Sequence, residues 1–488
     1  MLSYGELRTA FPEFIYHGYQ VTESQQDIHV QYHFEIKGLS EFTPSWVFPK
    51  KVGDTAVYKD NTALLNMVFS LGMVELISYW KITCSPKVSI LCGSLDETQV
   101  AWWKKLYFNG LGEFYYTNHI DVSEDDFMII EAPVCKAAWV SDTKGAKIPV
   151  FEMDKTGRRK DAKELKGCLI PVGGGKDSAV TLDILKLSKA DNYCYIINPR
   201  GATLNTVDAA GYSRETQLVA VKRTLDARMI ELNRQGYLNG HTPYSAIVAF
   251  SSTIAAYLYG LKYIVLSNES SANESTVEGS SVNHQYSKSF EFENDFHSYE
   301  AAYIQSGTYY FSLLRPLSEF QIAAHFSLCP EYHDIFRSCN AGSKQDIWCG
   351  HCPKCLFVYL ILSPFLPAER MKEIFGTDML SDPEMKTYFS QLIGIGKEKP
   401  FECVGSRDEI NTAICMTIDD LKSEGKALPY LFEYYMTTGL YVQHHQAECP
   451  YDNFYDKTNL LPEAFAKLLK DACFGENAKG ARKFREVR

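Results

Sequence analysis

The stretch PVGGGKDSAV, residues 171–180, places three consecutive glycines between an apolar run and a helical pattern. The run CLIPV predicts a strand, and SAVTLDILKLSK, which begins at Ser178, predicts a helix. Glycines at such a junction let the backbone approach an anion, and the free N–H groups of the helix start donate to it. A tight turn without a ligand is the alternative, but such a turn rarely needs three glycines beside a lysine and an aspartate. The feature therefore favours a phosphate-binding loop.

Two familiar phosphate-binding templates do not fit this loop. A Walker loop requires serine or threonine after its lysine, whereas Lys176 is followed by Asp177. The dinucleotide fingerprint G-x-G-x-x-G matches Gly173 and Gly175 but meets Ser178 where its third glycine belongs. The loop therefore belongs to neither class.

From Cys168 onward, short apolar runs alternate with helical patterns. We expect strands at CLIPV, YCYII, MIELN and YIVLS, and helices at SAVTLDILKLSK, SRETQLVAVKRTL and YSAIVAFSSTIAAYLYG, the last closed by Gly260. This alternation predicts an α/β fold with a parallel sheet covered on both faces. Ligands of such sheets bind at the carboxyl ends of the strands. The glycine loop, NPRGAT and NESSANES are expected at those ends.

The rest of the chain has a different pattern on each side of this segment. DIHVQYHFEI alternates like a half-buried strand and NTALLNMVFSLGMVELISYW has helical spacing, which predicts an α+β N-terminal region. The polar, charged stretch 141–167 is expected to be a linker, and the pattern from Pro367 onward is mainly helical. We therefore expect an N-terminal domain over 1–150, a nucleotide-binding domain over 165–365 and a helical region over 366–488.

The net charge and the hydropathy of the chain limit the kinds of molecule that it is expected to bind. A formal net charge of −11 argues against a broad nucleic-acid surface. The N-terminal stretch lacks the pattern of a secretory signal, and the most apolar piece, CLFVYLILSPFLP, is too short to cross a membrane. We expect a soluble, cytoplasmic protein with a small-molecule substrate and no nucleic-acid or membrane partner, while its oligomeric state stays open.

Four of the 14 cysteines form a C-x9-C-x2-C-x2-C array: Cys339, Cys349, Cys352 and Cys355. Four thiolates with two short spacings can close a tetrahedron around zinc, which is typical of a structural site. His351 is an alternative ligand, and an iron–sulfur cluster or buried free thiols are alternative states of the cysteines. A structural zinc site is the leading prediction.

The glycine loop resembles the SGGxDS signature of the PP-loop ATP pyrophosphatase superfamily. Gly174 to Ser178 match it, and Gly173 stands where that superfamily usually has serine. The resemblance implies an adenine nucleotide hydrolase-like, Rossmann-like domain whose loop grips the phosphates of ATP and whose enzymes release pyrophosphate after passing AMP to the substrate. The cysteine array is similar to the zinc loop of the 7-cyano-7-deazaguanine synthases, which are PP-loop enzymes that activate a carboxylate. That likeness spans about residues 168–362.

The stretches LSNESSANES and NHQYSKSFEFE, within residues 266–293, depart from the deazaguanine enzymes. With GGGKDS, they look like the UDP-N-acetylmuramoyl-L-alanyl-L-glutamate epimerase family, MurL. The resemblance implies an enzyme of peptidoglycan precursor synthesis that converts the terminal L-Glu of UDP-MurNAc-L-Ala-L-Glu to D-Glu and consumes ATP. A deazaguanine nitrile synthase, a tRNA-modifying PP-loop ligase and a non-enzymatic ATP sensor stabilised by zinc are the alternatives.

The resemblance also implies residue roles. The expected nucleotide-binding set is Gly173, Gly174, Gly175, Lys176, Asp177, Ser178 and Asn268, with Asp177 also helping to hold Mg²⁺. The expected catalytic set is Lys176, Asp177, Glu269, His284 and Lys288, where His284, Tyr286 and Lys288 are candidates for the acid or base at the α-carbon. Asn268, Glu269 and Asn273 are candidates for nucleotide, metal or substrate contacts. Arg200 and Arg315 are candidates for binding phosphate or carboxylate, with ordinary ion pairs as the alternative.

Overall fold

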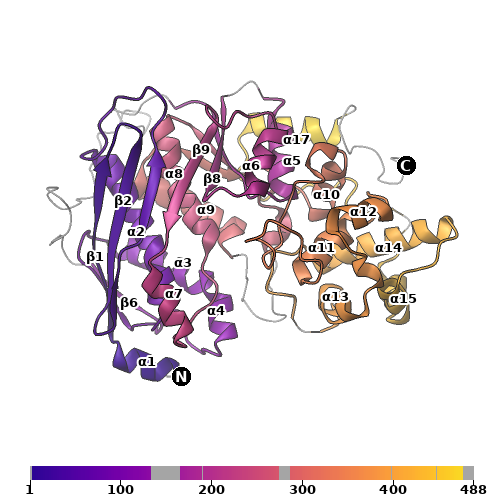
Figure 1. Cartoon of the computed structure of the whole chain (residues 1–488), viewed down its shortest axis with the longest axis horizontal. Helices are drawn as coiled ribbons and strands as arrows, with labels where there is room; N and C mark the ends of the chain where they lie inside the picture. Colours follow the sequence, from indigo (N-terminus) through magenta and orange to yellow (C-terminus); the bar gives the residue numbers. More distant parts are fainter. Residues whose placement is uncertain are drawn as a thin grey trace.

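The computed structural model describes residues 3–132, 165–188, 191–273, 286–396, 398–446 and 448–475. Its strands form one mixed sheet in the order β11-β10-β7-β8-β9-β4-β2-β1-β5-β6, with β3 paired to β2. The N-terminal strands lie at one end of the molecule and the C-terminal helices gather at the other (Figure 1). The protein is therefore a mixed α/β protein, as the alternating pattern predicted.

The parallel half of the sheet contains β7 (Cys168–Pro171), β8 (Asn192–Ile197), β9 (Leu218–Thr224), β10 (Tyr263–Leu266) and β11 (Tyr309–Ser312). Counted in chain order, these strands lie in the order 3-2-1-4-5, which is a doubly wound arrangement. Its first strand, β7, lies beside β10, and the winding reverses between them. This switch point is where ligands of doubly wound sheets bind.

The other half of the sheet comes from the N-terminal region. It contains β1 (Glu13–Glu23), β2 (Asp27–Ile36), β3 (Ser40–Phe42), β4 (Ser45–Pro49), β5 (Lys87–Ile90) and β6 (Ile129–Glu131). β4 pairs antiparallel with β9, so the two halves form one continuous sheet. The division into residues 1–150, 165–365 and 366–488 stays a prediction, and the expected linker at 141–167 lies almost entirely outside the described residues.

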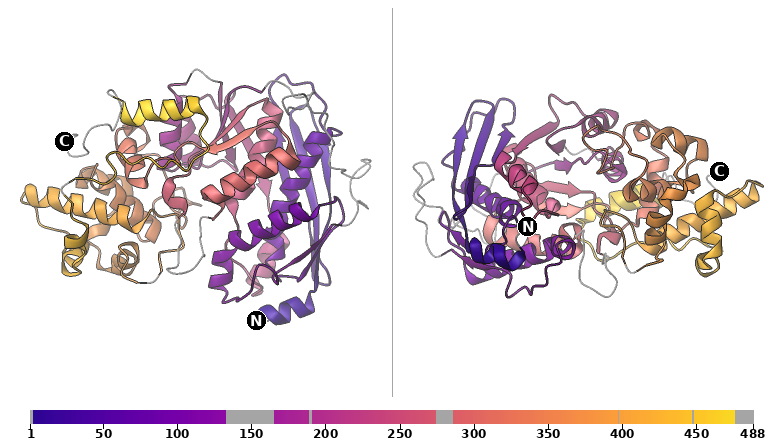
Figure 2. Two further views of the ribbon diagram at one scale, coloured as in Figure 1. Left: turned by 180° about the vertical axis from the view of Figure 1, so that it is seen from behind. Right: turned by 60° about the horizontal axis from the view of Figure 1, so that its bottom comes forward.

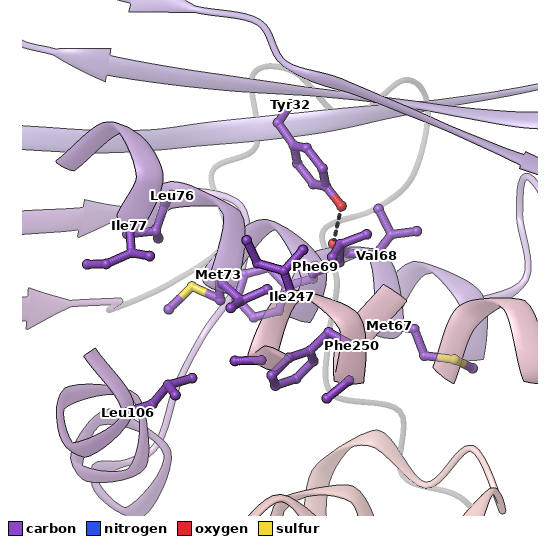
Figure 3. Close-up of a cluster of buried hydrophobic side chains, with 14 of the residues drawn as sticks. Tyr32, Met67, Val68, Phe69, Met73, Leu76, Ile77, Leu106, Ile247 and Phe250 are labelled. Carbon is purple, nitrogen blue, oxygen red and sulfur yellow. Dashed lines mark hydrogen bonds between the residues drawn. The ribbon is translucent and has the colours of Figure 1, made fainter. Parts of the chain in front are cut away.

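Helix α2 (Thr62–Trp80) is the central helix of the N-terminal region. By length and composition it could cross a membrane, but 89% of its most apolar window is buried inside the protein. Figure 3 shows Met67, Phe69 and Met73 of α2 packed beside Ile247 and Phe250 of α8 (Tyr244–Tyr259), with the Tyr32 hydroxyl donating to the Val68 carbonyl at 2.9 Å. The apolar character of α2 is therefore explained by the core.

The parallel strands separate two hydrophobic cores. Leu169, Ile264 and Tyr310 belong to the core that contains α2, α3 (Glu97–Gly110), α8 and α9 (Phe290–Tyr299). Ile170 and Val265 face the other core, which contains α5 (Lys176–Leu185), α10 (Glu319–Ser327), α11 (Pro353–Leu362) and α14 (Arg407–Ser423). Burial on both faces explains why these strands are continuous apolar runs.

The remaining helices frame these layers. They are α1 (Tyr4–Ala10), α4 (Gly112–Thr117), α6 (Gly201–Ala209), α7 (Ala227–Arg234), α12 (Ala368–Phe375), α13 (Lys386–Leu392), α15 (Tyr430–Thr437), α16 (Leu440–His444) and α17 (Glu463–Phe474). In the described part of the chain after Pro367, the regular elements are helices. Its last helix, α17, returns to pack beside α5 rather than beside α15 (Figure 2).

Two predicted elements were wrong. The expected helix SRETQLVAVKRTL contains strand β9, and the expected strand MIELN lies within helix α7. β9 has β8 on one side and β4 on the other, and its Val219 and Val221 are buried with a period of two. Asp226 then begins α7, because its side chain accepts a hydrogen bond from the Arg228 N–H. Sheet pairing between distant segments overrode the local helical spacing.

Candidate active site at the sheet switch point

The glycine loop follows β7 at the switch point. Gly174 has φ +82°, and a Cβ there would lie 3.1 Å from the Thr203 backbone nitrogen. The Gly174 carbonyl accepts from the Arg337 N–H at 2.7 Å. Gly173, by contrast, is exposed, and a Cβ there would meet no described atom within 4 Å. The loop is thus tightly held at Gly174 and open at Gly173.

Helix α5 begins directly after this loop, with Gly175 as its first flanking residue. Within the described residues, no side chain caps this helix start, so its first N–H groups have no side-chain acceptor. The Ser178 hydroxyl donates to the Gly175 carbonyl at 3.0 Å, which closes the first turn. An uncapped helix start behind a glycine loop is a favourable place for an anion such as a phosphate.

Three carboxylates converge beside the loop. Asp177 lies in the first turn of α5, Glu269 follows β10, and Glu319 is the first residue of α10, which packs beside α5. One carboxylate oxygen from each lies within 4.8 Å of the others. Oxygen ligands in this number suit a hard divalent cation such as Mg²⁺. Sequence reasoning singled out Asp177 and Glu269 but missed Glu319, because it did not predict β11, which precedes α10.

Lys176 contacts two of these carboxylates. Its ammonium contacts both Asp177 and Glu319, and its side chain is only 4% exposed. Burial alone would lower the pKa of Lys176, but the two carboxylates outweigh it and raise that pKa. The lysine therefore stays charged and offers a fixed positive group next to the glycine loop.

The two acidic partners of Lys176 respond differently to burial. Burial raises the pKa of Glu319 to about 8, and repulsion from Asp177 and Glu269 adds to the rise against the opposing effect of Lys176. Burial also acts to raise the pKa of Asp177, but Lys176 and Lys354 outweigh it and lower that pKa. Burial and the neighbouring carboxylates both act against a charged Glu319, so a cation bound at this cluster would favour the ionised form of that side chain.

Arg315 holds the backbone of two predicted site residues. It is fully buried, donates to the Glu269 carbonyl at 2.6 Å and to the Lys288 carbonyl, and pairs with Glu293 at 3.1 Å. Arg315 therefore forms a buried ion pair with Glu293 and positions the backbone of Glu269 and Lys288. The ion pair with Glu293 agrees with the ion-pair alternative, and a role of Arg315 in binding phosphate or carboxylate stays a prediction.

Of the other predicted residues, two are buried, one is exposed, and two lie partly or wholly outside the described residues. Asn268 is buried, and its amide donates to Ser312 at 3.0 Å, within the network that reaches Glu293 and Arg315. Tyr286 is buried against Phe292 in the core. Arg200 is exposed and donates to the Ser343 carbonyl at 3.3 Å. His284 lies outside the described residues, and for Asn273 only its place in the short helix 270–273 is described.

The four predicted cysteines lie together at the start of α11. Their sulfur–sulfur distances are 3.8 Å for Cys339–Cys352, 3.7 Å for Cys349–Cys355 and 3.5 Å for Cys352–Cys355. Sulfurs about 2.3 Å from a tetrahedral zinc would lie about 3.8 Å apart. The four sulfurs are therefore close enough to bind one metal ion such as zinc.

His351 lies beside the cysteine cluster but turns away from it. It is exposed, and its Nδ1 contacts the Cys349 carbonyl at 2.6 Å. Lys354, between Cys352 and Cys355 in the chain, reaches the carbonyl of Cys403. The cluster therefore anchors one wall of the candidate active site, and sequence reasoning missed both Lys354 and Cys403.

These features define a mixed α/β protein with a charged site at a sheet switch point, placed between a glycine loop and a four-cysteine cluster. Residues 6–313 match the model of the MurL N-terminal domain, and residues 335–433 match that of the MurL C-terminal domain. The chain belongs to the MurL family.

Two curated relatives give the extent of the similarity. UDP-N-acetyl-alpha-D-muramoyl-L-alanyl-L-glutamate epimerase from Salinispora tropica is 34% identical over 364 residues, which cover 73% of this chain and 74% of the relative. The protein of the same name from Xanthomonas oryzae pv. oryzae is 34% identical over 364 residues, with 73% and 75% covered. No solved structure matches the chain.

Proposed function

We propose that the chain is an ATP-dependent epimerase that converts the terminal L-Glu of UDP-MurNAc-L-Ala-L-Glu to D-Glu in peptidoglycan precursor synthesis. The observation that carries this proposal is the charged cluster of Lys176, Asp177, Glu269 and Glu319 beside the glycine loop, in a chain 34% identical to named epimerases over 73% of its length. Because its substrate is a nucleotide-linked precursor, we place the reaction in the cytoplasm.

The chemistry explains why an inversion without net bond change would consume ATP. Removing the α-proton beside a free carboxylate places a second negative charge next to the first. Adenylation cancels the carboxylate charge, so the α-carbanion is delocalised as an enolate and a positioned base can remove the proton. Water then cleaves the acyl-adenylate to AMP and the inverted product. Pyrophosphate release and hydrolysis make the cycle irreversible.

The proposed roles follow the geometry of the site. In a PP-loop domain, Gly173 to Gly175 and the start of α5 hold the ATP phosphates, with Ser178 and Asn268 at the edge of that site. Lys176 neutralises charge that develops during adenylyl transfer. Asp177, Glu269 and Glu319 hold Mg²⁺, which would neutralise phosphate charge when bound. The donor set supports this assignment, since all three ligands are oxygens.

We also propose that the four cysteines bind zinc in a structural role. All four ligand positions would be protein sulfurs, which leaves no open position for a substrate. Cys352 caps the start of α11, and Lys354 in the first turn reaches the Cys403 carbonyl. Zinc would therefore stabilise the wall of the site that carries Cys403.

The proposal is tested with purified protein, ATP, Mg²⁺ and UDP-MurNAc-L-Ala-L-Glu. We expect pyrophosphate and AMP to form, and D-Glu to appear when the product is hydrolysed and analysed by chiral chromatography. Lys176→Ala and Asp177→Ala should abolish pyrophosphate release, whereas Arg214→Ala, which changes an exposed side chain that pairs with Asp208, should retain most of it. Recovery of L-Glu alone after long incubation would refute the proposal.

A second substrate separates this function from its nearest alternative. The same assay with 7-carboxy-7-deazaguanine and ammonia should give no pyrophosphate above background. Turnover of that substrate in preference to the muramyl nucleotide would identify a nitrile synthase instead. Nucleotide binding without pyrophosphate release on either substrate would indicate a sensor.

A further inference from the structure

We infer that Cys403 is the side chain that transfers the proton at the α-carbon, held ready as a thiolate by Lys288. Cys403 lies in the segment between α13 and α14, and in the chain it is outside every motif noted in the sequence. Its sulfur accepts a hydrogen bond from the Lys288 ammonium at 3.1 Å. This assignment rests on the proposed epimerase function and deepens it, since it names the base that the proposed reaction requires.

Lys288 connects the thiol to the carboxylate cluster. Burial acts to lower the pKa of Lys288, but Cys403, Glu269 and Asp177 outweigh it and raise that pKa. The lysine therefore stays positively charged between the sulfur on one side and the carboxylates on the other. Arg315 fixes this arrangement, because it grips the carbonyls of both Glu269 and Lys288.

The Cys403 segment is also held from its other side. Lys354 donates to the Cys403 carbonyl from the start of α11. Phe401 packs against Tyr116 of α4 with ring centres 5.2 Å apart, and Asn340 contacts Glu402. Contacts from the N-terminal region, the cysteine loop and α11 therefore place a half-exposed thiol at the edge of the charged cluster.

The chemistry of the pair suits proton transfer at carbon. A neighbouring ammonium stabilises a thiolate, which is the reactive form of cysteine. In the proposed step the Cα–H bond breaks, an S–H bond forms at Cys403, and the electron pair moves into the adenylated carboxyl group as an enolate. Water delivers a proton to the opposite face of the enolate carbon, and the Cys403 thiol releases its own proton to solvent, which restores the thiolate. Cys403 is thus a catalytic residue in this proposal, and Lys288 is a positioning residue.

The test separates adenylation from proton transfer. The full-length protein is incubated in D₂O with ATP, Mg²⁺ and UDP-MurNAc-L-Ala-L-Glu, and pyrophosphate, α-deuterium and D-Glu are measured. Cys403→Ser should lose deuterium incorporation and D-Glu formation about 100-fold or more while pyrophosphate release continues. Cys449→Ser, at a half-exposed position after α16, is the matched control and should behave like the unchanged protein.

The outcomes distinguish this inference from the proposed function. No pyrophosphate from the unchanged protein would refute the epimerase proposal itself. Normal deuterium incorporation in Cys403→Ser would overturn only the role of Cys403, as would a parallel loss of pyrophosphate release.

Thiol alkylation provides an independent readout of the pair. Peptide mapping after brief iodoacetamide treatment should show Cys403 reacting faster than Cys449 at neutral pH. Lys288→Met should slow that reaction, and Lys288→Arg, which keeps a cation, should restore part of it. Equal reactivity of the two cysteines in the unchanged protein would overturn the inference even if every Cys403 variant failed to fold.

Discussion

At the scale of single residues, two glycines of the loop differ in whether their position could accept a side chain. Gly174 has a left-handed backbone and a close approach to α6, whereas Gly173 faces open space. The serine that PP-loop proteins usually have at the first position would therefore fit at Gly173. The departure from the SGGxDS signature costs a hydroxyl donor but removes no structural requirement.

Gly174→Ala and Gly173→Ser should therefore behave differently. The alanine must adopt φ near +82° and press against Thr203, so we expect a loss of about 1–3 kcal/mol in unfolding free energy and little pyrophosphate release. Gly173→Ser should keep both within normal range. Urea denaturation and the pyrophosphate assay measure the two effects. Equal tolerance of both substitutions would show that the loop backbone is not held as described.

At the scale of elements, one residue at the start of α11 both caps the helix and belongs to the candidate metal site. Cys352 accepts from the Cys355 N–H at 3.5 Å and lies within 3.8 Å of two other cysteine sulfurs. The helix start, the cysteine loop and the Cys403 segment are therefore coupled. A metal bound by the four cysteines, as we propose, would stabilise the wall of the site without taking part in the chemistry.

Cys352→Ser should reduce bound zinc from about one ion per chain to nearly none, because one of four ligands is lost. It should also lower the melting temperature, since metal binding contributes folding free energy. His351→Ala is the matched control and should keep its metal, because His351 is exposed and turned toward the Cys349 carbonyl. Metal analysis and thermal unfolding check both variants. Full zinc content in Cys352→Ser would refute the four-cysteine site.

At the scale of the whole molecule, one buried ion pair supports the join between the two halves of the sheet. Glu75 of α2 is fully buried and pairs with Arg223 of β9 at 2.8 Å, and Trp46 of β4 donates to the same carboxylate at 3.2 Å. The three residues come from both halves and meet at the β4–β9 pairing. The N-terminal strands and strands β7 to β11 should therefore unfold together.

Glu75→Gln tests this coupling. Removing one charge leaves Arg223 buried without its partner, so we expect a loss of about 3–5 kcal/mol in unfolding free energy. Replacing both residues, as Glu75→Leu with Arg223→Met, should cost less than the single change. Tryptophan fluorescence and circular dichroism should report one shared transition. Two separate transitions in the unchanged protein would show that the halves fold independently.

The sequence pointed to those residues of the candidate site that lie within short motifs. Lys176, Asp177 and the four cysteines could be recognised because the residues of each group lie only a few positions apart in the chain. Glu319, Lys354 and Cys403 had no such signal, because each reaches the site from a separate element. The wrong predictions at β9 and α7 have a similar cause. β9 pairs with strands from distant parts of the chain, and a pattern over a few neighbouring residues does not include them.

The sequence by itself determined the glycine loop, the alternation that builds an α/β sheet, the apolar helix α2 and the metal-ligand spacing. All of these depend on backbone preference or periodicity over a few residues. Only the tertiary structure decided that β4 joins the two halves, that Arg315 is a buried clamp, and that Lys288 lies 3.1 Å from the Cys403 sulfur. Such contacts depend on packing between distant segments, and local chain preference does not encode them.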